Sequence, residues 1–167
     1  MVFKQLSRLS LVPVFVAIFA FSFLGTSVTS ASNAGGMIYA SNLTEDGKLA
    51  GEGNRVLMIE FSSEFCGYCR LLENEFLKPM MRNSEYGEKV VIRSISLSDN
   101  DSLIDFNGSR VSASEFAAKY GVIVTPTLIF LDEHGQEVSD KLVGIWSVDY
   151  YGAYIDQRID SARKLGF

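Results

Sequence analysis

Residues 56–69 read VLMIEFSSEFCGYC and contain the only two cysteines of the chain, Cys66 and Cys69. The apolar run Val56–Phe61 is typical of a buried strand, and Arg70–Leu77 continues with a helical pattern. The thiols therefore lie where a strand passes into the first turn of a helix, whose unpaired N–H groups and positive dipole end stabilise a thiolate. Two thiols one helical turn apart can form and reopen a disulfide, so the pair can exchange two electrons with cysteines of another protein.

Two other roles for the cysteine pair are weaker. A disulfide that only stabilises the fold usually joins segments far apart in sequence, because so short a loop removes little entropy from the unfolded chain. A closed zinc site needs more ligands than this one pair and the single histidine of the chain, His134, provide. We therefore favour a redox role and expect no metal.

The N-terminal segment has the pattern of an export signal. Lys4 and Arg8 precede an apolar run over Leu9–Leu24, and Thr29-Ser30-Ala31 supplies small residues for a cleavage site. A membrane-spanning helix needs about 20 apolar residues, and this run is shorter. We therefore expect residues 1–31 to be a cleaved signal peptide, with an uncleaved anchor as the alternative. Either case places the rest of the chain in the periplasm or otherwise outside the cytoplasm.

The remaining chain is acidic and has the length of one domain. Without Lys4 and Arg8, the 15 basic side chains become 13 against 20 acidic ones, a net charge of −7. This charge argues against nucleic acid and anionic membrane surfaces as partners. Residues 32–54 are rich in Gly, Ser and Asn, so we expect a flexible mature N-terminus there and the folded domain over 55–167. A short strand or helical turn within residues 37–49 stays open.

Apolar patterns predict an alternation of strands and helices along this domain. Pro79 should kink or end the first helix near Lys78, and the polar residues 98–112 should form a surface loop. Ser112 and Glu115 form a capping-box pattern at the start of the second helix. The expected strands are 55–62, 90–97, 127–131 and 137–143, and the expected helices are 70–81, 112–120 and 150–164.

The order of these elements predicts an α/β fold with a mixed sheet. Strands joined through a helix run parallel, whereas the turn signal at Asp132–Gly135 predicts an antiparallel pair. Helices should then cover both faces of the sheet.

Two segments resemble the thioredoxin family. Met58–Cys69 is similar to the active-site strand and helix start of thioredoxin-fold proteins, and Tyr120–Phe130 is similar to the segment that carries their cis-proline. The resemblance covers about residues 55–163 and is nearest to exported bacterial thioredoxins of the SoxW-like kind and to the catalytic domain of Dsb-type disulfide isomerases. It implies a thioredoxin-like fold with a central sheet of about four to five strands. Cytoplasmic thioredoxins have Trp before the first cysteine and Gly-Pro between the two, whereas Phe65 and Gly67-Tyr68 stand here.

The resemblance assigns roles to both cysteines and to Glu60. Cys66, nearer the surface, should attack the substrate disulfide, and Cys69 should then attack the mixed disulfide. Glu60 precedes Cys66 on the strand, like the buried acid of the family, and should relay the proton of the resolving thiol with a raised pKa. The pattern alone leaves open that Glu60 reaches the sheet edge and water.

The resemblance also predicts the substrate contacts. It implies a cis bond before Pro126, which lets the backbone of Thr125 pair with an extended substrate segment. Tyr68 is expected to tune the disulfide and to form part of an apolar docking surface. His134 should be solvated in its turn, and Trp146 is expected to serve packing rather than recognition.

Together these features predict an exported thiol–disulfide oxidoreductase that reduces or exchanges disulfides in proteins through Cys66 and Cys69. We expect a monomer without a bound cofactor that acts on cysteine-containing exported proteins and takes electrons from a membrane carrier. Glu64 and the acidic domain favour a reductant, since strong oxidants need concentrated positive charge at the attacking sulfur. Two alternatives stay open: a redox-inert thioredoxin-like binding module and a disulfide-forming oxidase.

Overall fold

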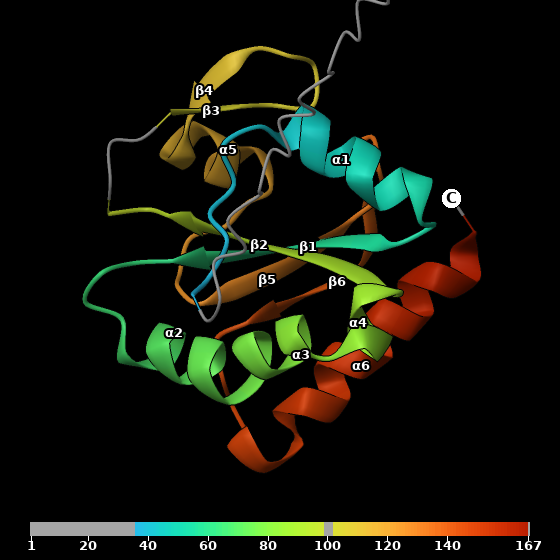
Figure 1. The fold of residues 1–167 in the computed structure, drawn as a ribbon. Coiled ribbons are helices and arrows are strands. Elements are labelled where there is room, and N and C mark those ends of the chain that lie inside the picture. The colour runs from blue at the N-terminus through green and yellow to red at the C-terminus, as the bar shows by residue number, and fades with distance from the viewer. Residues whose placement is uncertain (1–35, 99–101, 167) are drawn as a thin grey trace, which may run out of the picture. The chain divides into compact units, whose positions relative to one another are not determined.

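The structure, a computed structural model, describes residues 36–98 and 102–166 (Figure 1). The predicted signal peptide over residues 1–31 lies outside the described residues. In chain order the elements are α1 (Leu43–Glu52), β1 (Val56–Ser62), α2 (Gly67–Leu72), η1 (Glu73–Leu77), α3 (Lys78–Arg82), α4 (Ser84–Gly87), β2 (Val90–Ser96), β3 (Ser102–Ile104), β4 (Arg110–Ser112), α5 (Ala113–Lys119), β5 (Thr127–Leu131), β6 (Glu137–Val143) and α6 (Val148–Leu165). Every strand and helix expected from the sequence is present.

The central sheet has the strand order β2-β1-β5-β6, and β3 and β4 form a separate two-stranded sheet. β1 runs parallel to β2 and antiparallel to β5, and β5 runs antiparallel to β6. The predicted mixed sheet is therefore confirmed. Because β1 is an interior strand that is buried along its whole length, it holds the start of the cysteine motif firmly at its carboxyl end.

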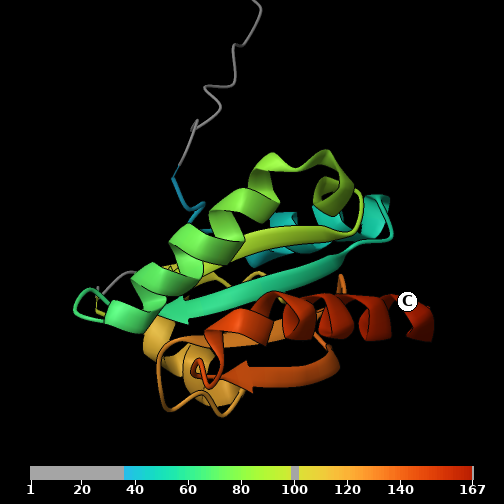
Figure 2. The same cartoon turned by 90° about the horizontal axis from the view of Figure 1, so that it is seen from below.

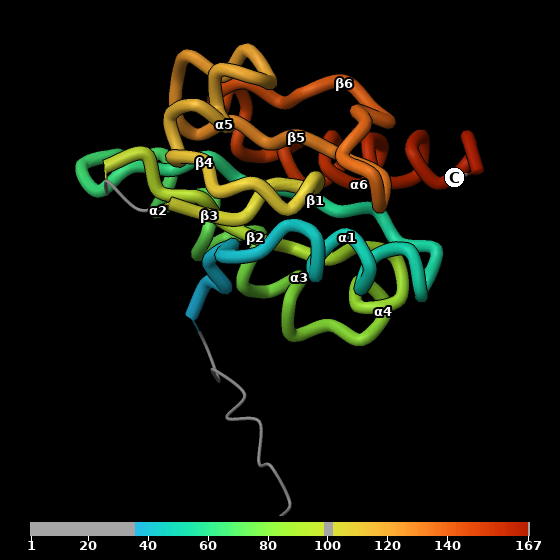
Figure 3. Tube along the Cα trace, turned by 90° about the horizontal axis from the view of Figure 1, so that it is seen from above, coloured from blue at the N-terminus to red at the C-terminus, as the bar shows by residue number. Residues whose placement is uncertain are grey.

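Side chains of β1 alternate between two cores. Met58 belongs to a core with residues of α2, η1, α3 and α6, whereas Leu57, Ile59 and Phe61 belong to a core with residues of α1 and α5. α2, α3 and α6 cover one face of the sheet (Figure 2), and α1 and α5 cover the other (Figure 3). The prediction of helices on both faces is confirmed. By the same alternation, Glu60 points toward the face that α2, η1, α3 and α6 cover.

The helix after the motif is interrupted just before Lys78 but does not end there, which decides between the two outcomes expected for Pro79. Glu73–Leu77 forms a π-helical turn between α2 and α3, and Pro79 lies in the first turn of α3. The wider turn accommodates a residue that has no N–H and whose ring clashes with a carbonyl group of a regular helix. The N–H of Lys78 donates to the carbonyl oxygen of Glu73, and the helical path continues to Arg82.

The predicted flexible segment over residues 32–54 is wrong for its second half, which forms α1. The side chain of Asn42 caps this helix by accepting two backbone hydrogen bonds, and Leu43 is completely buried. Gly47 weakened the helical pattern in the sequence. A Cβ atom on Gly47 would lie only 2.4 Å from the carbonyl oxygen of Glu133, so glycine lets α1 pack closely on the β5–β6 turn.

The predicted surface loop over residues 98–112 is also wrong in part, because it contains the β3–β4 hairpin. Leu103 of β3 lies opposite Val111 of β4. Leu103 is buried in the core that α1 and α5 cover. Each of these strands has only three residues, which is too short for an alternating apolar pattern to be recognised in a polar stretch.

The start of α5 agrees with its sequence signal. The hydroxyl of Ser112 accepts a hydrogen bond from the N–H of Glu115 at 3.2 Å, and the Glu115 carboxylate accepts one from the N–H of Ser112 at 2.9 Å. This reciprocal pair is the predicted capping box.

None of the helices within residues 36–98 and 102–166 has the length and apolar character needed to cross a membrane.

Candidate active site

Cys66 and Cys69 form a disulfide at the start of α2, with their Sγ atoms 2.05 Å apart. Cys66 is the N-cap residue, and its Sγ accepts a hydrogen bond from the N–H of Cys69 at 3.0 Å. A hydrogen bond of this kind stabilises a thiolate on Cys66 when the pair is reduced. Cys66 is partly exposed, whereas Cys69 is 1% exposed. An incoming disulfide can therefore reach Cys66, and Cys69 lies behind it.

Glu60 on β1 is completely buried. Neither oxygen of its carboxyl group has a hydrogen-bond partner among the described residues, and the hydroxyl of Ser94, opposite Glu60 on β2, pairs with that of Ser62 at 3.2 Å instead. Burial, and secondarily the negative charge of Glu73, raise the pKa of Glu60 to about 8, while the Ser94 hydroxyl and the Lys78 ammonium group oppose the rise. Glu60 thus does not reach water at the sheet edge, and its carboxyl group can exchange a proton near neutral pH.

An ion pair between Glu73 and Lys78, on the helical segment after the motif, affects the pKa of Glu60. Lys78 Nζ lies 3.4 Å from Glu73 Oε2 and 2.8 Å from Asn74 Oδ1. The π-helical turn between the two ends of this pair makes the meeting possible, because a regular helix would turn positions 73 and 78 to different sides. The pairing of Glu73 with Lys78 therefore could not be predicted from their spacing in the sequence. The only sequence signal for this pair was the carboxylate of Glu73, one helical turn after Cys69.

The loop that carries Pro126 lies against the residues that precede the motif. Ser63 Oγ and Thr125 Oγ1 are 3.1 Å apart. The Thr125–Pro126 peptide bond is cis, the geometry that the resemblance implies. Within the described residues, neither the N–H nor the carbonyl group of Thr125 has a hydrogen-bond partner. Both groups are therefore available to an extended segment of another chain.

Exposed apolar side chains lie on the two segments that carry the cysteines and Thr125. Phe65 and Tyr68, next to the cysteines in sequence, are 89% and 61% exposed. Ile123 and Val124, next to Thr125, are also exposed. Large apolar side chains so exposed around one site indicate an interaction surface. Tyr68 was predicted to lie on such a surface, whereas Ile123 and Val124 were not, because β-branched residues are typical of buried strands.

Two further residues considered in the sequence analysis do not contact the cysteines. Trp146 is half-exposed, and its ring centroid lies 5.6 Å from that of Tyr151 and 5.4 Å from that of Tyr154. These contacts agree with the expected packing role. His134 is exposed in the β5–β6 turn, with its Nε2 atom 3.3 Å from Glu133 Oε1.

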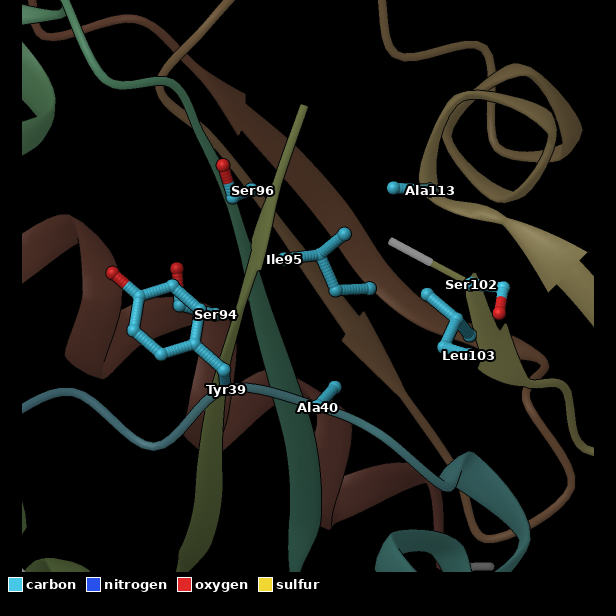
Figure 4. A pocket seen from close by; sticks show the side chains of 8 residues that line it. All are labelled: Tyr39, Ala40, Ser94, Ile95, Ser96, Ser102, Leu103 and Ala113. Atoms are coloured by element: carbon cyan, nitrogen blue, oxygen red, sulfur yellow. The ribbon is translucent and has the colours of Figure 1, made fainter. Parts of the chain in front are cut away.

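A cavity of about 290 Å³ opens between β2, β3 and the start of α5 (Figure 4). The side chains of Ile95, Leu103 and Ala113 line it, together with the segment at Tyr39 and Ala40. No residue of the cysteine motif or of the Pro126 loop lines this cavity, so it is not part of the candidate site.

Among residues 36–98 and 102–166, no group of three or more His, Cys, Asp and Glu side chains is placed to hold a metal ion.

The fold and the site together define a class of protein. A mixed four-stranded sheet between helices, with a C-x-x-C disulfide at a helix start and a proline loop beside it, is the architecture of thioredoxin-fold thiol–disulfide oxidoreductases. Residues 43–159 match the family model described as Thioredoxin-like domain, and the chain belongs to this family.

Solved structures agree with this fold. A thioredoxin from Malassezia sympodialis is 22% identical with a TM-score of 0.51, over 75% of this chain and 92% of that chain. Thioredoxin f from spinach chloroplast is 16% identical with a TM-score of 0.50, over 77% and 95% of the two chains. The oxidoreductase DsbH is 19% identical with a TM-score of 0.50, over 79% and 88%. The search of curated proteins found no match.

Proposed function

We propose that this protein is an exported thiol–disulfide oxidoreductase that reduces or exchanges disulfides in other proteins. One arrangement carries the proposal: a disulfide with an accessible sulfur on Cys66 and a buried one on Cys69, preceded on β1 by the buried, unpaired carboxyl group of Glu60. A redox-inert pair needs neither an accessible first sulfur nor a buried acid whose burial is unfavourable for folding.

The reaction proceeds in two exchange steps. In the reduced protein, the Cys66 thiolate attacks one sulfur of the substrate disulfide, a mixed disulfide forms and the first substrate thiolate leaves. Cys69 then gives its proton to ionised Glu60 and attacks the Cys66 sulfur. The Cys66–Cys69 disulfide forms and the second substrate thiolate leaves, so two electrons pass from the protein to the substrate.

Substrate recognition combines backbone pairing with apolar contact. An extended substrate segment pairs with the N–H and carbonyl groups of Thr125, beside Pro126. The exposed side chains of Phe65, Tyr68 and Ile123 then cover the apolar residues around the substrate cysteine. Cysteine-containing segments that are extended and apolar are therefore the preferred substrates.

The cellular setting follows from the N-terminal sequence. The basic and apolar pattern of residues 1–31 supports export, so the substrates are exported proteins. A reductant in an oxidising compartment needs a continuous supply of electrons, for which we propose a membrane electron carrier. We also propose that the protein acts as a monomer.

Reduction of insulin by dithiothreitol tests the activity. The protein without its first 31 residues should accelerate the precipitation of insulin chains, and Cys66→Ser should abolish the acceleration. His134→Ala, which changes an exposed turn, is the matched control and should retain full activity. An inactive wild-type protein with an intact fold would overturn the proposed activity in favour of a binding module.

Export is tested separately by cell fractionation and N-terminal sequencing. We expect the chain in the exported fraction to begin near Ser32. A full-length chain on the membrane would replace the signal peptide by an anchor, and a full-length chain in the cytoplasm would overturn export.

A further inference from the structure

We propose that Tyr151 is a positioning residue for substrate recognition: its hydroxyl group, acting through Gly144, holds the Pro126 loop so that the backbone of Thr125 faces a substrate. The inference rests on the proposed function, in which Thr125 pairs with the substrate. Tyr151 lies on α6 and is completely buried. The sequence pattern marked it only as one apolar position of that helix.

Two consecutive hydrogen bonds connect Tyr151 to the loop. The Tyr151 hydroxyl donates to the carbonyl oxygen of Gly144 at 3.0 Å, and the N–H of Gly144 donates to the carbonyl oxygen of Pro126 at 2.8 Å. Gly144 thus receives a hydrogen bond from α6 on one side and gives one to the loop on the other.

Gly144 lies directly after the end of β6. Val143, the last residue of β6, is still paired with Thr127 of β5, and Gly144 leaves the strand with a φ of 67°. This left-handed conformation favours glycine, and it takes the backbone out of the regular ladder. The hydrogen bond from Tyr151 therefore fixes a peptide group that the sheet itself does not hold.

Other contacts hold the loop from its remaining sides. The Thr127 hydroxyl donates to the carbonyl oxygen of Val124 at 2.8 Å, and the hydroxyl groups of Ser63 and Thr125 are 3.1 Å apart. We infer that these hydrogen bonds fix the orientation of the Thr125 backbone, so that its unpaired N–H and carbonyl groups face the substrate. Removal of the Tyr151 hydroxyl loosens the anchor behind Pro126 and leaves the other anchors unchanged.

The hydroxyl group acts as a hydrogen-bond donor and not as an acid. Burial, and secondarily the charge of Glu60, raise the pKa of Tyr151 above its ordinary value, so the phenol keeps its proton. The ring is held independently, because its centroid lies 5.6 Å from those of both Phe76 and Trp146. Tyr151→Phe therefore removes the hydrogen bond while the ring packing stays.

The test compares a protein substrate with a small disulfide that has no backbone. For Tyr151→Phe, the KM for insulin should rise about three- to tenfold, the range that corresponds to one net hydrogen bond, while kcat changes less. The reduced variant should react with dithiobis-nitrobenzoate at the wild-type rate, because this reagent cannot pair with Thr125. Tyr154→Phe is the matched control, since its ring also contacts Trp146, and it should leave both reactions unchanged.

Each other outcome overturns the inference. An unchanged KM for insulin shows that the hydroxyl does not position the loop. Equal losses on insulin and on the small disulfide indicate a general structural effect, which a matching fall in Tm would corroborate. A shifted pH profile with an unchanged KM indicates that Tyr151 acts on Glu60 instead. Inactive wild-type protein would refute the proposed function itself, so the two failures are distinguishable.

Discussion

At the residue scale, the behaviour of Glu60 follows from where β1 places it. The strand is interior and its neighbours at 58 and 59 are core residues, so the carboxyl group has no route to water. Such a group is retained at a cost to folding, because burial disfavours its charged form. The same burial brings its pKa to about 8, where the group can exchange protons under physiological conditions.

Glu60→Gln should change the pH dependence of stability. The pKa of Glu60 is about 8 in the folded protein against 4.5 for an ordinary glutamate, so the folded state holds a proton that the unfolded state has lost. The wild-type free energy of unfolding should therefore fall as pH rises from 4.5 to about 8, whereas the variant should lack this fall. Between pH 4 and pH 9 the wild-type protein should lose on the order of 5 kcal/mol of stability relative to the variant, measured by urea unfolding. Parallel pH curves for both proteins would contradict the prediction.

The same substitution should slow the second exchange step. Without a carboxylate to take the proton of Cys69, the resolution of a preformed mixed disulfide should be roughly tenfold slower or more. In the wild-type protein the rate should increase as pH approaches about 8, and the Glu60→Gln rate should lose this dependence. Stopped-flow measurements of single turnovers check both points. An unchanged rate would assign Glu60 no part in proton transfer.

The two cysteines should differ in what they trap. Because Cys66 is accessible and Cys69 is buried, Cys69→Ser should accumulate mixed disulfides with substrate proteins, and Cys66→Ser should trap few. Affinity purification followed by non-reducing electrophoresis measures the trapped species. Equal trapping by the two variants would remove the division of roles.

At the element scale, the helical segment after the motif combines three pieces that a regular helix cannot replace. α2 begins at the disulfide, the π-helical turn brings Lys78 to Glu73, and Pro79 lies in the first turn of α3. The irregular turn thus accommodates the proline and also places an ion pair where it acts on Glu60. The π-helical turn therefore influences the pKa of Glu60, the proposed proton acceptor.

α1 should contribute to the stability of the domain. Leu43→Ala removes a completely buried side chain and should lower the free energy of unfolding by about 2–5 kcal/mol. Leu49→Ala on the same helix is the matched control, because Leu49 is partly exposed, and its cost should be about 0.5 kcal/mol. Chemical denaturation measures both values. Equal small effects would mean that α1 is not part of the cooperative unit.

At the scale of the whole molecule, the charge around the disulfide favours a reductant. The chain has a net charge of −5, and Glu64 lies close to Cys66 in sequence. Arg70, the nearest cation in sequence, donates a hydrogen bond from Nη1 to the carbonyl oxygen of Glu64 at 3.3 Å. The site therefore lacks the concentrated positive potential that makes a disulfide strongly oxidising.

We accordingly expect a reduction potential of about −270 to −180 mV, between those of thioredoxin and protein disulfide isomerase. Equilibration of the purified protein with glutathione buffers measures this value. Alkylation of thiols in living cells should show a substantial reduced fraction. A reduction potential of about −120 mV, with all of the protein oxidised in the cell, would instead identify a disulfide-forming oxidase.

Local sequence determined the strands, most helices and the cysteine pair, because their signals lie within a few residues of one another. The apolar run of β1, the Ser112 cap and the C-x-x-C spacing depend on neighbours in the chain. The mixed sheet also followed, since the lengths of the connections decide strand direction. The resemblance then directed attention to Glu60 and Pro126.

Only the tertiary structure decided the features that depend on distant partners. α1 is a helix despite its glycines because these glycines pack against Glu133, far along the chain. The sequence left open whether Glu60 meets water, and its burial between β2 and β5 resolves that question. The bonds from Tyr151 through Gly144 to Pro126 join α6, the end of β6 and a loop. Hydrogen bonds that join a helix, a strand end and a loop leave no periodic pattern in a single sequence, so only the folded chain reveals them.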